Sequence, residues 1–129
     1  MKDKAICKDT GMLLIRLSLA IVFIAYGWAK VGDMAGTVGF FSSLGLSSFW
    51  AYLVGWVELL GGIAMLLGVC TKWAGWLLAI TMAVAIYLVK GSAGLMGGYD
   101  FNLVLLLTAL GVSFTGPGTL TIGKLLGKE

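Results

Sequence analysis

Residues 49–69 read FWAYLVGWVELLGGIAMLLGV, and Glu58 is the only charged side chain in this run. A helix needs ~20 mostly apolar residues to cross a ~30 Å hydrocarbon core, so the run is long enough to span a membrane. An ionisable side chain inside such a span is costly to place there and is a functional-site hypothesis by default. The stretch therefore predicts a transmembrane helix that carries a carboxylate of functional interest.

Further apolar stretches accompany this one, and together they predict a bundle of transmembrane helices. We place the spans at about residues 11–31, 48–69, 73–89 and 101–115. The chain of 129 residues is 60% hydrophobic and 12% charged, which is too apolar for a soluble domain of this length. We therefore expect an all-α, polytopic membrane protein in which residues 1–129 form a single four-helix transmembrane domain. A short interfacial helix is expected near Phe40 and Phe41.

The lysines indicate how these helices are oriented in the membrane. With a cytoplasmic N-terminus, the outer side carries only Lys30 and Lys90, and the cytoplasmic side carries Lys2, Lys4, Lys8, Lys72, Lys124 and Lys128. Cytoplasmic loops are enriched in Lys and Arg, so this asymmetry predicts that both termini are cytoplasmic. The net charge of +3 is explained in this way and does not indicate nucleic-acid binding, because no basic face is large enough.

The histidine and cysteine content limits the metal chemistry of this chain. There is no histidine, which excludes His-ligated haem and His-based zinc or copper sites. Cys7 and Cys70 lack the spacing of a metal site such as CxxC, so no metal is expected. In the predicted orientation both thiols face the cytoplasm, where thiols stay reduced. We interpret them as inert, with a redox-active pair as the alternative.

The polar residues of the first two spans suggest a partner for Glu58. Gly55 and Gly62 lie one turn on either side of Glu58, so the carboxylate should face another helix and not lipid. Arg16 and Lys30 share one face of the first span, roughly 21 Å apart along its axis. Glu58 lies roughly 13 Å below the outer end of its own helix, which is closer in depth to Arg16. We predict that Arg16 and Glu58 interact, directly or through water, either as a structural ion pair or as part of a ligand or proton site.

The start of the fourth span carries two more candidate residues. Asp100 follows a glycine-rich loop and precedes an apolar run, which is typical of a structural helix cap. Asn102 lies on one face with Leu106, Ala109 and Ser113, from which it could hydrogen-bond across the bundle. Lys30 and Lys90 are expected to extend their ammonium groups toward the membrane surface.

Several of these residues stand in an order that resembles the DoxX family. The likeness runs from about Leu13 to Ile122 and rests on Arg16-Leu17, Gly27-x-x-Lys30, Glu58-Leu-Leu-Gly-Gly62, Gly68, Asp100-Phe-Asn102 and Gly116-Pro-Gly118. The resemblance implies a small four-helix, multi-pass protein of a prokaryotic plasma membrane. Some members are the membrane subunit of a thiosulfate:quinone oxidoreductase, and others are linked to quinone or thiol stress. Arg16, Lys30, Glu58 and Asn102 match the polar pattern of the family.

The favoured functional hypothesis is a membrane subunit of, or partner to, a quinone- or thiol-linked redox system. A small ligand, with quinone as the candidate, would bind near Glu58 and Arg16, where Arg16 holds an anionic oxygen and Glu58 handles a proton. The sequence carries no flavin, haem or iron–sulfur motif, so we expect no intrinsic cofactor and no catalysis by this chain alone. The electrons would come from a redox partner protein or from the substrate.

The alternative hypothesis is a non-catalytic scaffold or assembly protein that forms homo- or hetero-oligomers. In that case the Arg16–Glu58 pair is structural and fixes the register of two helices. A small transporter is a third hypothesis, which the lack of an internal repeat or broken-helix pair disfavours.

Overall fold

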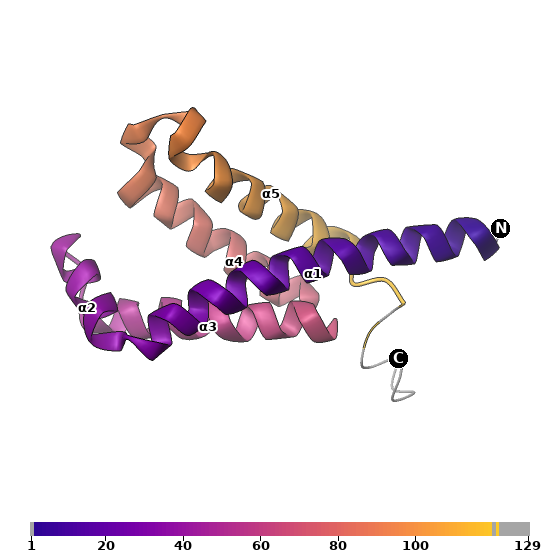
Figure 1. Ribbon diagram of the computed structural model, residues 1–129, viewed down its shortest axis with the longest axis horizontal. Coiled ribbons are helices and arrows are strands. Elements are labelled where there is room, and N and C mark those ends of the chain that lie inside the picture. The colour runs from indigo at the N-terminus through magenta and orange to yellow at the C-terminus, as the bar shows by residue number, and fades with distance from the viewer. Residues whose placement is uncertain (1, 120, 122–129) are drawn as a thin grey trace.

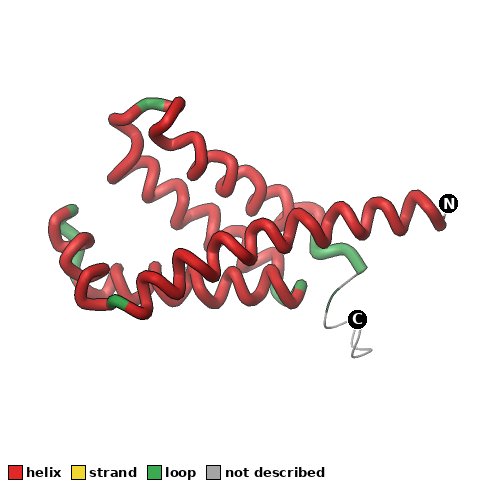
Figure 2. The backbone as a smooth tube through the Cα atoms, in the orientation of Figure 1, coloured by secondary structure: helices red, strands yellow, loops and turns green. Residues whose placement is uncertain are grey.

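The computed structural model describes residues 2–119 and 121, and within them every regular element is helical. The helices are α1 (Lys2–Gly32), α2 (Met34–Ser43), α3 (Ser48–Leu67), α4 (Thr71–Ala85) and α5 (Asp100–Thr115). Between α4 and α5 lie two π-helical turns, η1 (Ile86–Lys90) and η3 (Leu95–Tyr99), and a 3-10 turn, η2 (Gly91–Ala93). No β-strand occurs in this described part of the chain (Figure 2).

Four of the helical segments are long and apolar enough to cross a membrane, as the sequence predicted. They are Ile6–Gly32, Ser48–Leu67, Thr71–Ala93 and Leu95–Thr115. The first, third and fourth are longer than the predicted spans. The third gains Thr71, Lys72, Lys90 and η2, and the fourth gains η3. The backbone where these two spans meet leaves the helical conformation at Gly94, Met96 and Gly97, as a glycine-rich loop would.

A short helix also forms where Phe40 and Phe41 were expected to lie in one. Asp33 precedes α2, and its Oδ1 accepts a hydrogen bond of 3.2 Å from the Gly36 backbone N–H. This side chain satisfies one of the backbone donors that every helix start leaves free. Phe41 is buried, so α2 packs onto the bundle through this residue.

The helices pair into two arms, α1 with α3 and α4 with α5, and these two pairs share the most extensive contacts in the molecule. Figure 1 shows the arms meeting near the α3–α4 turn and diverging toward α2 and the α4–α5 connection. The buried core lies where the arms meet and is formed by residues such as Leu19, Phe23, Met65, Leu78 and Val112. The other end stays open between the arms.

Close backbone approach holds α1 against α3 in a fixed register. A Cβ atom added to Gly27 would collide with the backbone N of Leu59, and one added to Gly62 would lie 2.8 Å from the backbone N of Ile24. Both glycines therefore mark points where only a hydrogen atom fits between the two helices. Small residues at such contacts allow membrane helices to pack through van der Waals contact.

The two ends of the described chain lie at the closed end of the molecule (Figure 1). Thr119 Oγ1, after α5, donates a hydrogen bond of 2.6 Å to Asp9 Oδ2 in the first turns of α1. The start of α1 and the segment after α5 thus lie on the same side of the bundle. That this side is cytoplasmic remains a prediction from the lysines.

Candidate ligand cavity and buried charges

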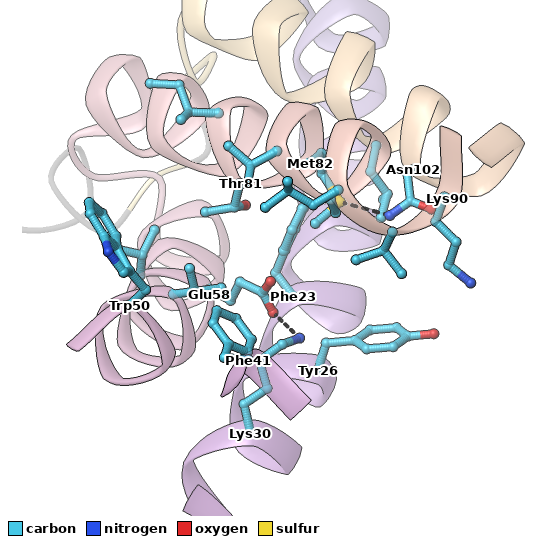
Figure 3. A pocket seen from close by; sticks show the side chains of 18 of the residues that line it. Phe23, Tyr26, Lys30, Phe41, Trp50, Glu58, Thr81, Met82, Lys90 and Asn102 are labelled. Carbon is cyan, nitrogen blue, oxygen red and sulfur yellow. Dashed lines mark hydrogen bonds and ion pairs between the residues drawn. The ribbon is translucent and has the colours of Figure 1, made fainter. Parts of the chain in front are cut away.

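A cavity of about 860 Å³ lies between the two arms, at the open end of the molecule. Its walls come from α1, α2 and α3 on one side and from α4, η1, η3 and α5 on the other. Most lining side chains are apolar or aromatic; the polar ones are Tyr26, Lys30, Thr81, Glu58, Lys90 and Asn102 (Figure 3). An apolar pocket with a few convergent polar groups is the usual form of a small-molecule site.

Glu58 pairs with Lys30 in this cavity. Lys30 Nζ donates to Glu58 Oε2 over 2.8 Å, and the two side chains are 26% and 4% exposed, respectively. Lys30 Nζ also lies 5.5 Å from the centre of the Tyr26 ring. Figure 3 shows the pair reaching across from α1 to α3. The predicted interaction between Arg16 and Glu58 is therefore wrong, and Lys30 does not simply extend outward.

The register of α1 against α3 explains why Arg16, and not Lys30, was predicted as the partner of Glu58. The prediction assumes that the outer ends of the first two spans lie at one level. In the structure Gly27 lies against Leu59, so α3 begins beyond the level at which α1 ends. In antiparallel helices, three residues beyond Gly27 correspond to a level one turn before Leu59. The Cβ of Lys30 therefore lies level with Gly55, 3.4 Å from where a Cβ on that glycine would be, and the long side chain of Lys30 reaches one turn along α3 to Glu58.

Arg16 instead holds the C-terminal end of α3. Its Nε donates to the Met65 carbonyl over 2.9 Å, Nη2 to the Leu66 carbonyl over 3.1 Å, and Nη1 to the Pro117 carbonyl over 2.9 Å. The last carbonyls of a helix lack intrahelical partners and carry the negative end of the helix dipole. A guanidinium group with several donors satisfies both needs and also ties the segment after α5 to the bundle.

Gly68 makes room for this arginine. It ends α3 in the left-handed conformation with φ of 74°, and a Cβ at this position would lie 2.7 Å from Arg16 Nη2. Glycine adopts this conformation without steric cost and is the common residue after a helix end. Arg16 is only 1% exposed and does not line the cavity.

The other cavity wall carries Asn102. Its Nδ2 lies 3.6 Å from Met82 Sδ on α4, a contact between a good donor and a weak acceptor. Asp100 is the first residue of α5 and not the preceding cap residue; its carboxylate accepts hydrogen bonds from the backbone N–H groups of Gly97 and Phe101. Asp100 therefore satisfies backbone donors at the start of α5, whereas Asn102 lines the cavity.

Aromatic contact links the arms beside the charged pair. The rings of Tyr26 on α1 and Phe101 on α5 have their centres 6.2 Å apart. Both residues line the cavity and both are about half exposed. The two arms therefore touch at this point as well as at the closed end.

The structure places Cys7 and Cys70 on the surface as free thiols. In the described residues, no three His, Cys, Asp or Glu side chains gather as candidate metal ligands.

Comparison with known proteins agrees with these features. The DoxX family model matches residues 11–91, which is more than half of the chain. The chain belongs to the DoxX family. The matched segment of this DoxX protein contains Arg16, Lys30 and Glu58 and ends before Asn102.

Two curated relatives of the DoxX protein align over most of its length. The first, named "Putative oxidoreductase CatD" in Bacillus subtilis (strain 168), is 40% identical over 114 residues, covering 88% of this chain and 85% of CatD. The second, named "Inner membrane protein YqjF" in Escherichia coli (strain K12), is 32% identical over 127 residues, covering 95% and 96%. No solved structure gives a significant match. Its four long apolar helices and its membership of this family together identify the DoxX protein as a multi-pass membrane protein.

Proposed function

We propose that this DoxX protein is a membrane component of a quinone- or thiol-linked redox system in a prokaryotic plasma membrane, and that it binds a small apolar ligand between its arms. The observation that carries the proposal is the Lys30–Glu58 pair at 2.8 Å on the wall of a largely apolar cavity of about 860 Å³. The name of the relative CatD supports a redox role, and that of YqjF supports the membrane.

The cavity suits a quinone better than a small polar ligand. Its volume is near the upper end of the ~300–1,000 Å³ typical of small-molecule sites, which leaves room for a ring and part of a tail. Phe23, Phe41, Trp50 and Phe101 supply aromatic walls for a flat ring. A quinone supplies two-electron, two-proton chemistry when bound, and a partner protein would supply or remove the electrons.

The charged pair supplies two of the functions that such a ligand needs. The Lys30 ammonium has donors beyond the one that it gives to Glu58, and these can hold a carbonyl oxygen. Glu58 can give or take a proton at the same place. Arg16, which was expected in this site, belongs to the end of α3 and takes no part in ligand contact.

The competing proposal is a scaffold or assembly protein that forms homo- or hetero-oligomers. One observation favours it: the Lys30–Glu58 ion pair joins α1 to α3, as expected of a pair that only fixes the packing of two helices. A buried pair is weak evidence for net stability, because the cost of removing two charges from water can cancel their attraction.

The substitution Glu58→Gln separates the two proposals. Glutamine keeps the size of the side chain and its hydrogen-bonding oxygen but cannot exchange a proton. The rate of quinone-linked oxidation by membranes that carry the variant should therefore fall about 100-fold or more. The variant should still reach the membrane and elute from size exclusion like the wild type. The matched control is Thr81→Val, whose hydroxyl also lines the cavity but already donates to its own helix at Leu78.

Two results would count against the ligand proposal. Unchanged oxidation by Glu58→Gln membranes would remove the carboxylate from the chemistry. Loss of complex assembly, with the isolated variant still folded, would favour the scaffold.

A further inference from the structure

One oxygen of Glu58 remains available to a ligand. Oε2 accepts from Lys30, and Oε1 makes no hydrogen bond within the described residues. No buried side-chain oxygen or nitrogen in that part of the chain is sealed off without a partner, so Oε1 must be reachable from the cavity. Together, the spare donors of Lys30 and Oε1 of Glu58 present both a donor and an acceptor at this wall.

Asn102 presents the same combination on the opposite arm. Its carbonyl oxygen Oδ1 accepts no hydrogen bond from the described residues and is likewise not sealed off. Its Nδ2 has only the weak contact with Met82 Sδ at 3.6 Å. Figure 3 shows the Asn102 amide beside α4 and the Glu58 carboxylate on the other side of the cavity. Asn102 is half-buried, so the polar atoms of its amide remain available to a ligand or to water in the cavity.

We infer that the cavity binds a ring that carries two oxygen functions, and that it contacts the ring at two points, Lys30–Glu58 on one arm and Asn102 on the other. The carbonyl form and the hydroxyl form of this ring then bind with similar affinity. A carbonyl oxygen only accepts hydrogen bonds, whereas a hydroxyl both donates and accepts. Each anchor offers a donor and an acceptor, so either form of the ring can be satisfied at both anchors, at Asn102 by rotation of the side-chain amide. The inference rests on the proposed function and specifies its ligand class.

The consequence is that the oxidised and the reduced ring bind at the same place. Two-point contact also favours a dioxygenated ring over a ring with a single hydroxyl. The apolar remainder of the cavity is left for a hydrocarbon tail.

The test uses the purified full chain in lipid nanodiscs and three probes with the same short alkyl tail: a benzoquinone, its quinol kept under anaerobic conditions, and a monophenol. Binding is followed by quenching of tryptophan fluorescence, because Trp50 lines the cavity. The wild type should bind quinone and quinol with affinities within about threefold of each other, and each tighter than the phenol. These limits reflect one hydrogen bond, whose loss costs about three- to tenfold in affinity.

The decisive variant is Asn102→Leu, which keeps the size of the side chain and removes both of its polar functions. It should lower the affinity for quinone and for quinol by about three- to tenfold. The affinity for the phenol should not change, because the single oxygen of the phenol hydrogen-bonds to the Lys30–Glu58 pair. Thr108→Val is the matched control on the same helix: its hydroxyl donates to the Val104 carbonyl and the residue does not line the cavity, so all three affinities should stay at wild-type values.

The outcomes distinguish this inference from the proposed function. If the wild type binds neither quinone nor quinol, the proposed function fails. If it binds one form more than tenfold tighter than the other, or if Asn102→Leu leaves both unchanged, the two-point inference fails and the proposed function stands. Equal weakening of all three probes by Asn102→Leu would show general damage to the cavity and would also overturn the inference.

Discussion

The substitution Arg16→Leu is expected to lower the melting temperature of the purified protein by on the order of 10 °C. The guanidinium group is buried and donates to the carbonyls of Met65, Leu66 and Pro117. Without it, the carbonyls of Met65 and Leu66 at the end of α3 lose their donor, and the Met65 carbonyl is buried. An acceptor left in this state costs about 1–3 kcal/mol, so the total should reach about 3 kcal/mol.

Two controls show whether the loss comes from this arrangement. Arg16→Lys keeps the charge but has no planar fork to reach three carbonyls, so it should recover only part of the stability. Lys72→Met removes an exposed cation near the same end of the bundle and should change stability by less than about 0.5 kcal/mol. The measurement is thermal unfolding in one detergent. A melting temperature for Arg16→Leu close to that of Lys72→Met would contradict the role of Arg16.

The number and type of spans were predictable because each depends on one local property. A run of about 20 apolar residues can satisfy its backbone in lipid only as a helix. The glycines around Glu58 also indicated correctly that this side chain faces protein, and it is 4% exposed. Both predictions needed only the composition and periodicity of a single helix.

The partner of Glu58 was not predictable in the same way, because it depends on the register between two helices. That register is set by where the backbones approach most closely, at Gly27 with Leu59 and at Gly62 with Ile24. The sequence shows many glycines and does not say which of them meet. The register decides whether Lys30 or Arg16 lies within reach of Glu58, and both side chains are cations that could pair with a carboxylate.

The role of Arg16 was missed for a different reason. Its partners are backbone carbonyls, which every residue has and which leave no mark in the sequence. One signal was available: Gly68, a typical glycine after a helix end, lies at the depth of a basic residue on the neighbouring span. The cavity itself gave no signal, since its walls are the same apolar residues that a packed core would use.

The register also makes Gly27 one of the positions most sensitive to substitution. Gly27→Ala places a Cβ against the backbone N and Cα of Leu59, and a backbone cannot yield by changing a rotamer. α1 and α3 must then separate, and over-packing of this kind costs about 3 kcal/mol. Thermal unfolding should show a loss comparable to that of Arg16→Leu.

The same substitution should also weaken ligand binding, unlike Arg16→Leu. Lys30 lies one turn beyond Gly27 on α1, so separating the helices pulls its ammonium group away from Glu58 and disturbs the cavity wall. Gly111→Ala is the matched control, because it lies inside α5 with no atom within 4 Å of the added Cβ. Alanine is the better helix former by up to about 1 kcal/mol, so this variant should be as stable as the wild type or more so. If Gly27→Ala matched Gly111→Ala in both stability and quinone affinity, close contact between α1 and α3 could not be what positions Lys30 beside Glu58.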